Sequence, residues 1–157
     1  MCIQLSEVIC IISQSDFPES WPDLLDQLLG MIDSSNFSAN LVILKTCHNI
    51  FKRYRLEERS DDLYREINFV MEKFGPALLQ IFFGIDNLLK SGIPDSSSLN
   101  LVLQNATYAN KIFYSLSYQD IPAFIEDNLS AFMTILMSFY NFQSSAIVTE
   151  NEERPGV

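Results

Sequence analysis

The sequence predicts an all-α fold of antiparallel helical hairpins, and three observations support it. Apolar residues recur every three or four positions along most of the chain, as on one face of a helix, and no strand-like alternation competes. Short polar or proline-containing stretches separate these segments. Similar corners also recur, because Asp16-Phe17-Pro18 and Asp120-Ile121-Pro122 both place an acid two residues before a proline. Repeated helix, corner and helix units are typical of an α-solenoid with HEAT-like repeats.

The first predicted hairpin covers about residues 1–33. Residues 1–14 have one apolar face, and no capping sequence precedes them. We therefore expect the chain to be part of a longer solenoid, the alternative being a short protein that lost its first repeats. Ser20, an N-cap residue type two positions before Pro22, predicts a second helix over residues 20–32. Trp21 begins the apolar stripe of that helix, so we expect it to pack in the core.

The second predicted hairpin covers about residues 38–91. Its first helix starts at Ser38 or Asn40 and runs to about residue 56, and its second runs from about residue 63 to 89. Pro76 lies inside the second helix, where it removes one hydrogen bond and clashes with a carbonyl, so we expect a kink or a short break. The stretch 91–95, which contains glycine and proline, ends the hairpin.

The third predicted hairpin covers about residues 97–141. Ser97 or Ser98 is expected to cap its first helix, and Asp120 its second. Residues 143–157 are acidic and lack the apolar pattern, so we expect a flexible end. Because each hairpin covers its neighbour, the two ends of the array are left apolar. We therefore expect the isolated chain to be weakly stable or prone to aggregate.

Composition excludes several classes of function. The net charge of −10 disfavours nucleic acid or an anionic membrane surface as the main partner, and no apolar run is long enough to span a membrane. His48 is the only histidine, and it has no neighbours at ligand spacing, so we expect no metal site. Ser, Cys and His are not arranged for nucleophilic catalysis, and no glycine-rich phosphate loop is present. The sequence thus predicts neither an enzyme nor a cofactor.

The odd cysteine count, without CxxC pairs, indicates a reducing compartment and buried thiols, including that of Cys47.

Four motifs carry a family resemblance. Asp16-Phe17-Pro18, followed after two residues by Trp-Pro-Asp-Leu-Leu (21–25), resembles the early repeats of importin-β-type nuclear transport receptors. The segments IFKRYR (50–55), IFYSL (112–116) and QDIPAFIEDN (119–128) resemble the branch of that family that returns importin-α to the cytoplasm. The resemblance runs from about Leu5 to about Phe142.

The resemblance implies a nuclear export receptor that binds importin-α together with Ran-GTP, shuttles between nucleus and cytoplasm, and has no enzymatic activity. This chain then corresponds to a section of the N-terminal arch, and binding of either partner by the section alone is expected to be weak or absent. The alternative is a helical-repeat interaction scaffold that takes no part in transport.

Two groups of residues are candidates for partner binding. Asp23, Asp26 and Gln27 lie opposite the leucine stripe of their helix. The resemblance places such helices on the concave, partner-binding surface, whereas the simpler interpretation is a solvated face. The second group, Lys52, Arg53 and Arg55, is the only basic cluster, and it suits an acidic partner. Its simpler interpretation is helix C-terminal charge, paired with Glu57, Glu58, Asp61 or Asp62.

Overall fold

The structure, a computed structural model, describes residues 7–9, 11–13, 16–33, 35–93 and 95–142. Every regular element within these residues is helical, which confirms the predicted all-α class. After helical residues at 7–9 and 11–13, the elements are α2 (Leu24–Gly30), α3 (Phe37–Phe51), the short 3-10 helix η1 (Lys52–Arg55), α4 (Asp61–Ser91), α5 (Ser96–Ser117), α6 (Ala123–Asp127) and α7 (Leu129–Tyr140).

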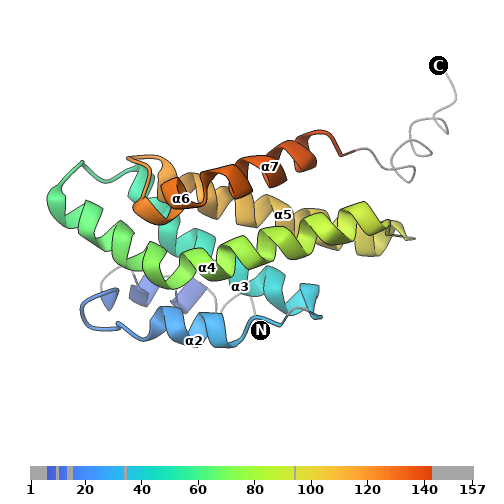
Figure 1. Cartoon of the computed structure of the whole chain (residues 1–157). Coiled ribbons are helices and arrows are strands. Elements are labelled where there is room, and N and C mark those ends of the chain that lie inside the picture. Colours follow the sequence, from blue (N-terminus) through green and yellow to red (C-terminus); the bar gives the residue numbers. More distant parts are fainter. Residues whose placement is uncertain (1–6, 10, 14–15, 34, 94, 143–157) are drawn as a thin grey trace, which may run out of the picture.

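The helices form two layers (Figure 1). In this view α2, α4 and α7 make the front layer, with α4 in contact with both of its neighbours. Behind them α3 packs along α5, and this is the most extensive helix pair. Helices from successive hairpins therefore lie side by side within each layer, which is the arrangement of a solenoid. The division into three hairpins at the predicted boundaries stays a prediction.

Aromatic side chains join the two layers. Phe82 of α4 is fully buried and meets Phe132 edge-to-face at a ring-centroid distance of 5.6 Å. Phe82 also stacks on Phe139 of α7 at 5.7 Å and meets Phe113 of α5 at 6.2 Å. Such pairs add to the free energy gained from burial. Nearby, the ring of Phe124 in α6 lies so close to Gly75 that a Cβ atom there would be 2.5 Å from it, so α4 and α6 approach closely because residue 75 has no side chain.

The helix starts differ from those predicted. The N-cap of α3 is Asn36, whose side chain accepts a hydrogen bond from Ala39 N, so Ser38 and Asn40 lie inside the helix. Asp95 rather than Ser97 or Ser98 caps α5.

The two helices that follow a proline corner also start later than predicted. Helix α2 begins only at Leu24, so Ser20 does not cap it, and Pro22 lies in a turn before the helix. Asp120 accepts a hydrogen bond from the adjacent Ile121 N, and the helix starts after Pro122 as two pieces that meet at Asn128. At α3 and α5 a neighbouring residue of equal capping ability is the N-cap, and at α2 and α6 a turn or bend precedes the helix where the cap was predicted.

Pro76 does not interrupt α4, which is helical from Asp61 to Ser91, so of the expected kink or short break the break is absent. The helix changes direction near its middle in Figure 1, as expected where a proline removes a hydrogen bond. Gly92, with φ of 83°, follows the last turn and ends the helix as predicted.

Trp21 and Cys47 both contact the core, as expected. Trp21 is partly buried against it, and Cys47 is fully buried. The other two cysteines and residues 143–157, the predicted flexible end, lie outside the described residues.

Apolar residues remain exposed at both ends of the array. Ile11, on the first helical segment, is 66% exposed. On α7, exposed apolar side chains follow one another at helical spacing: Leu129, Met133, Met137 and Tyr140. In Figure 1 these two segments lie on opposite sides of the molecule. This agrees with the predicted apolar ends.

Candidate partner-binding surfaces

The first candidate group lies on the exposed side of α2. Asp23, Asp26 and Gln27 are all exposed. Asp26 Oδ2 lies 2.5 Å from Lys73 Nζ, so its charge is partly neutralised by α4. Within the described part of the chain, the side chains of Asp23 and Gln27 make no hydrogen bond or ion pair, and Asp23 gives no capping bond although it holds the N-cap position. These two residues are therefore available to a partner.

A hollow of about 550 Å³ lies farther along the same layer, between α4 and α6–α7. Asp86, buried in its wall, has one oxygen 2.5 Å from Lys90 Nζ, whereas its other oxygen, Oδ1, has no hydrogen-bond partner among the described residues. Exposed Phe83 and Asp127 lie beside it. We call the exposed side of α2, α4 and α7 the front face, and its acidic and amide groups suit a basic partner.

Arg53, from the second group, is engaged within the fold. Its guanidinium binds the carboxylate of Glu66 in α4, donates to Phe17 O at 3.3 Å and lies 3.5 Å from Glu57. Tyr54 Oη donates to the same oxygen of Glu66 at 2.8 Å. Burial raises the pKa of Glu66 above its ordinary value, against the lowering effect of these hydrogen bonds. Arg53 thus holds the first corner, η1 and α4 together.

Lys52 and Arg55, the other basic candidates, point away from that cluster. Lys52 is exposed and donates to Asn49 Oδ1 at 3.1 Å. The guanidinium of Arg55 lies 5.6 Å from the ring centroid of Tyr114 in α5. Both residues line a hollow of about 440 Å³ between η1 and α5. Neither has a carboxylate within 4.0 Å among the described residues.

Sequence reasoning missed two cations of this region. Lys45 of α3 and Lys111 of α5 both lie near the ring of Tyr108. Their Nζ atoms are 5.5 and 4.7 Å from its centroid. A signal was available, because neither α3 nor α5 contains a single Asp or Glu. His48 lies beside the same ring. Burial and the charges of Lys111, Arg55 and Lys52 lower the pKa of His48 to about 4, so its imidazole is neutral at pH 7.

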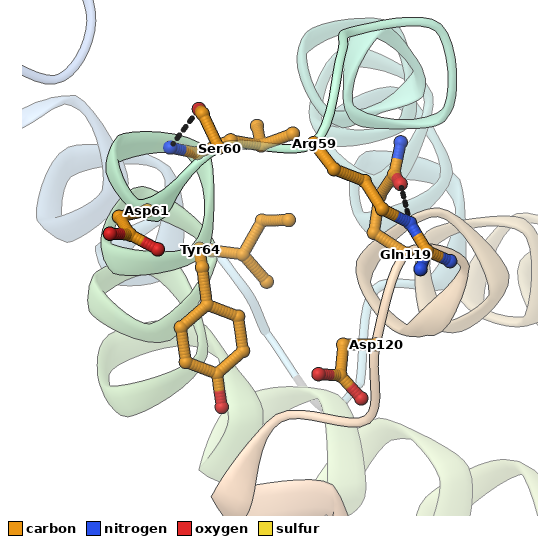
Figure 2. A pocket seen from close by; sticks show the side chains of 8 residues that line it. Arg59, Ser60, Asp61, Tyr64, Gln119 and Asp120 are labelled. Atoms are coloured by element: carbon orange, nitrogen blue, oxygen red, sulfur yellow. Dashed lines mark hydrogen bonds between the residues drawn. The ribbon is translucent and has the colours of Figure 1, made fainter.

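A third hollow, of about 370 Å³, lies where the corner between η1 and α4 meets the corner between α5 and α6 (Figure 2). Gln119 closes this corner: its amide nitrogen donates to Tyr54 O and Glu57 O, both at 3.0 Å, and its oxygen accepts from Arg59 Nε at 3.1 Å. Ser60, on the opposite wall, caps α4 by accepting from Leu63 N. Gln119 and Arg59 therefore join the two corners.

The described residues include no cluster of three or more metal-ligating side chains. None of the helices resolved in them is both long and apolar enough to cross a membrane. The described residues thus form two exposed helix faces of opposite charge, one in each layer.

Comparisons with known proteins agree with this architecture. Residues 50–157 match the family model described as Cse1. Exportin-2 of Danio rerio is 36% identical over 154 residues, which is 98% of this chain and 16% of that protein. The importin-alpha re-exporter of Schizosaccharomyces pombe is 38% identical over 151 residues, 96% of this chain and 16% of that protein. The chain therefore spans about one sixth of the length of these relatives.

A solved structure supports the same match. The exportin Cse1 in its cargo-free, cytoplasmic state superposes with a TM-score of 0.85 at 32% identity, covering 91% of this chain and 16% of that one. The predicted HEAT-like solenoid class is confirmed by this similarity. The comparisons favour the transport hypothesis over an unrelated scaffold.

Proposed function

Because the chain belongs to the Cse1 family, we propose that it is a section of a nuclear export receptor that carries importin-α out of the nucleus together with Ran-GTP. The observation that carries the proposal is similarity along nearly the whole chain, in sequence and in fold, to proteins named exportin-2, importin-alpha re-exporter and exportin Cse1. The chain supplies helices of one solenoid section, and the complete receptor supplies the remaining contacts.

The proposed mechanism is binding without chemistry. The two layers hold the front face in place, and Asp23, Asp26 and Gln27 lie on it as acidic and amide groups for a basic partner. Asp23 and Gln27 are the stronger candidates, because Asp26 already pairs with Lys73. The proposal includes shuttling between nucleus and cytoplasm and no catalytic activity.

A chimeric receptor tests the proposal directly. The matching segment of Danio rerio exportin-2 is replaced by this chain, and purified importin-α and GTP-loaded Ran are added in a pull-down. We expect the chimera to retain both proteins in a complex that depends on GTP. A chimera that melts like the parent receptor but retains neither protein would sink the proposal.

The front face is tested in the same chimera by reversing its unpaired groups. Asp23→Lys combined with Gln27→Lys should weaken capture of a basic partner by roughly tenfold, if each position contributes about 0.7 kcal/mol as exposed charges do. Glu58→Lys is the control, because Glu58 is an exposed acid at the corner outside the front face. Equal losses in both variants would show a general charge effect and remove the front face from the proposal.

A further inference from the structure

Acidic residues are absent from the rear layer. The chain has 20 Asp and Glu residues, but none lies in the sequences of α3, η1 or α5, about a quarter of its length. The same elements hold five of the ten Lys and Arg residues. Charge is therefore separated between the layers, which net composition hides.

Four of these five cations are unpaired. Arg53 is bound to Glu66, but Lys45, Lys52, Arg55 and Lys111 have no carboxylate within 4.0 Å among the described residues. The other exposed cations described in α4 each have an acid beside them: Arg65 has Asp62 and Lys90 has Asp86. Three of the rear cations instead lie over aromatic rings, Lys45 and Lys111 over Tyr108 and Arg55 over Tyr114, and Lys52 donates to Asn49. Their charge is thus available for an anionic partner.

Three of the four cations act on one place. Lys111, Arg55 and Lys52 all lower the pKa of His48, so their fields overlap at that ring. Lys45, the fourth, lies 5.5 Å from the ring centroid of Tyr108, which His48 also contacts. Beside them, the hollow of about 440 Å³ has cations on its η1 side and the half-exposed rings of Tyr114 and Tyr118 on its α5 side. Leu56, at its edge, is 88% exposed. We call Lys45, Lys52, Arg55 and Lys111 with these tyrosines the rear basic face.

We infer that the rear basic face is a docking surface for an acidic peptide segment that carries an aromatic or aliphatic side chain. Carboxylates of the segment pair with Lys52, Arg55 and Lys111, and its apolar side chain enters the hollow against Tyr114 and Tyr118. This surface is distinct from the front face and does not depend on the proposed export function. Nucleic acid suits it less well, because the acids Glu57, Glu58, Asp61 and Asp62 follow η1 directly in a chain of net charge −10.

The test is fluorescence anisotropy with the whole 157-residue chain and a fluorescein-labelled synthetic peptide in which Asp and Glu surround two Phe residues. We expect saturable binding that weakens as salt is raised. Lys52→Glu and Lys111→Glu should each weaken it by roughly fivefold, since reversal removes an attraction and adds a repulsion. Tyr118→Ser should weaken it through the lost apolar contact.

Arg65→Glu is the matched control, because it reverses an exposed charge on α4, away from this face, and should change binding less than twofold. A peptide with Asn and Gln in place of the acids, and another with Gly in place of Phe, should both bind more weakly. The inference is overturned if the acidic peptide does not bind, if Arg65→Glu has the same effect as Lys111→Glu, or if oligothymidylate or phosphatidylserine vesicles bind more tightly at equal salt. Circular dichroism of each variant checks that it is folded.

Discussion

Substitutions of Tyr54 and Glu66 should have strongly non-additive effects on the free energy of unfolding. Tyr54 is fully buried and donates to Glu66 Oε1 at 2.8 Å, and Arg53 binds the same oxygen. Tyr54→Phe keeps the ring and removes one hydrogen bond to a charged acceptor. This should lower the free energy of unfolding by about 1.5–2 kcal/mol. Glu66→Ala leaves a buried hydroxyl and a half-buried guanidinium without their acceptor, and because Glu66 is partly exposed we expect a loss of about 3 kcal/mol.

The coupling appears in the double variant. Once Glu66 is alanine, the Tyr54 hydroxyl has no acceptor, so Tyr54→Phe should then cost about 0 kcal/mol or stabilise the fold slightly. The assay is urea unfolding followed by circular dichroism, where Tyr54→Phe alone should lower the midpoint by roughly 1 M. Tyr64→Phe is the control, because Tyr64 is 43% exposed, and it should change stability by less than about 0.5 kcal/mol. Additive losses in the double variant would refute the reasoning.

Three further predictions concern other parts of the fold. Phe82→Ala removes the ring that joins α4, α5 and α7 and should lower the free energy of unfolding by about 3–5 kcal/mol, measured in urea. Phe83→Ala, at a 40% exposed neighbour, should lower it far less. Similar losses in both variants would contradict the aromatic core. His48 has a folded-state pKa lowered from 6.5 to about 4, so the unfolded chain binds the proton first and stability falls as pH drops through this window. His48→Gln should flatten that part of the stability profile, and an unchanged profile would contradict the lowered pKa. Met133→Lys with Met137→Lys should reduce self-association in analytical ultracentrifugation with little change in unfolding midpoint. Unchanged self-association would show that the exposed apolar residues of α7 take no part in it.

The fold class was predictable from the sequence because each helix carries a long apolar stripe. The helix starts were not, because several capping residues compete within a few positions: Asp95 caps α5 although Ser97 and Ser98 follow it. Only the folded backbone decides which side chain reaches a free N–H group.

The basic candidates Lys52, Arg53 and Arg55 show a second limit of prediction from sequence. The Arg53–Glu57 pair follows from helical spacing and was expected. The stronger contact with Glu66 crosses a corner between two elements, and no local pattern indicates it. Lys111 lies even farther along the chain from Lys52, yet the lack of acids in both rear helices was readable in the sequence.

The amide side chains of the rear layer have a mechanical consequence. Asn105 of α5 donates to Phe37 O at the start of α3, and Gln119 bonds to Tyr54 O and Glu57 O at the other end. These bonds oppose sliding of α3 along α5. In the front layer, α4 meets α7 through aromatic packing, with no hydrogen bond between the two helices among the described residues. Bending of this section should therefore turn about an axis along α3 and α5, which keep their contact, while α4 and α7 move apart.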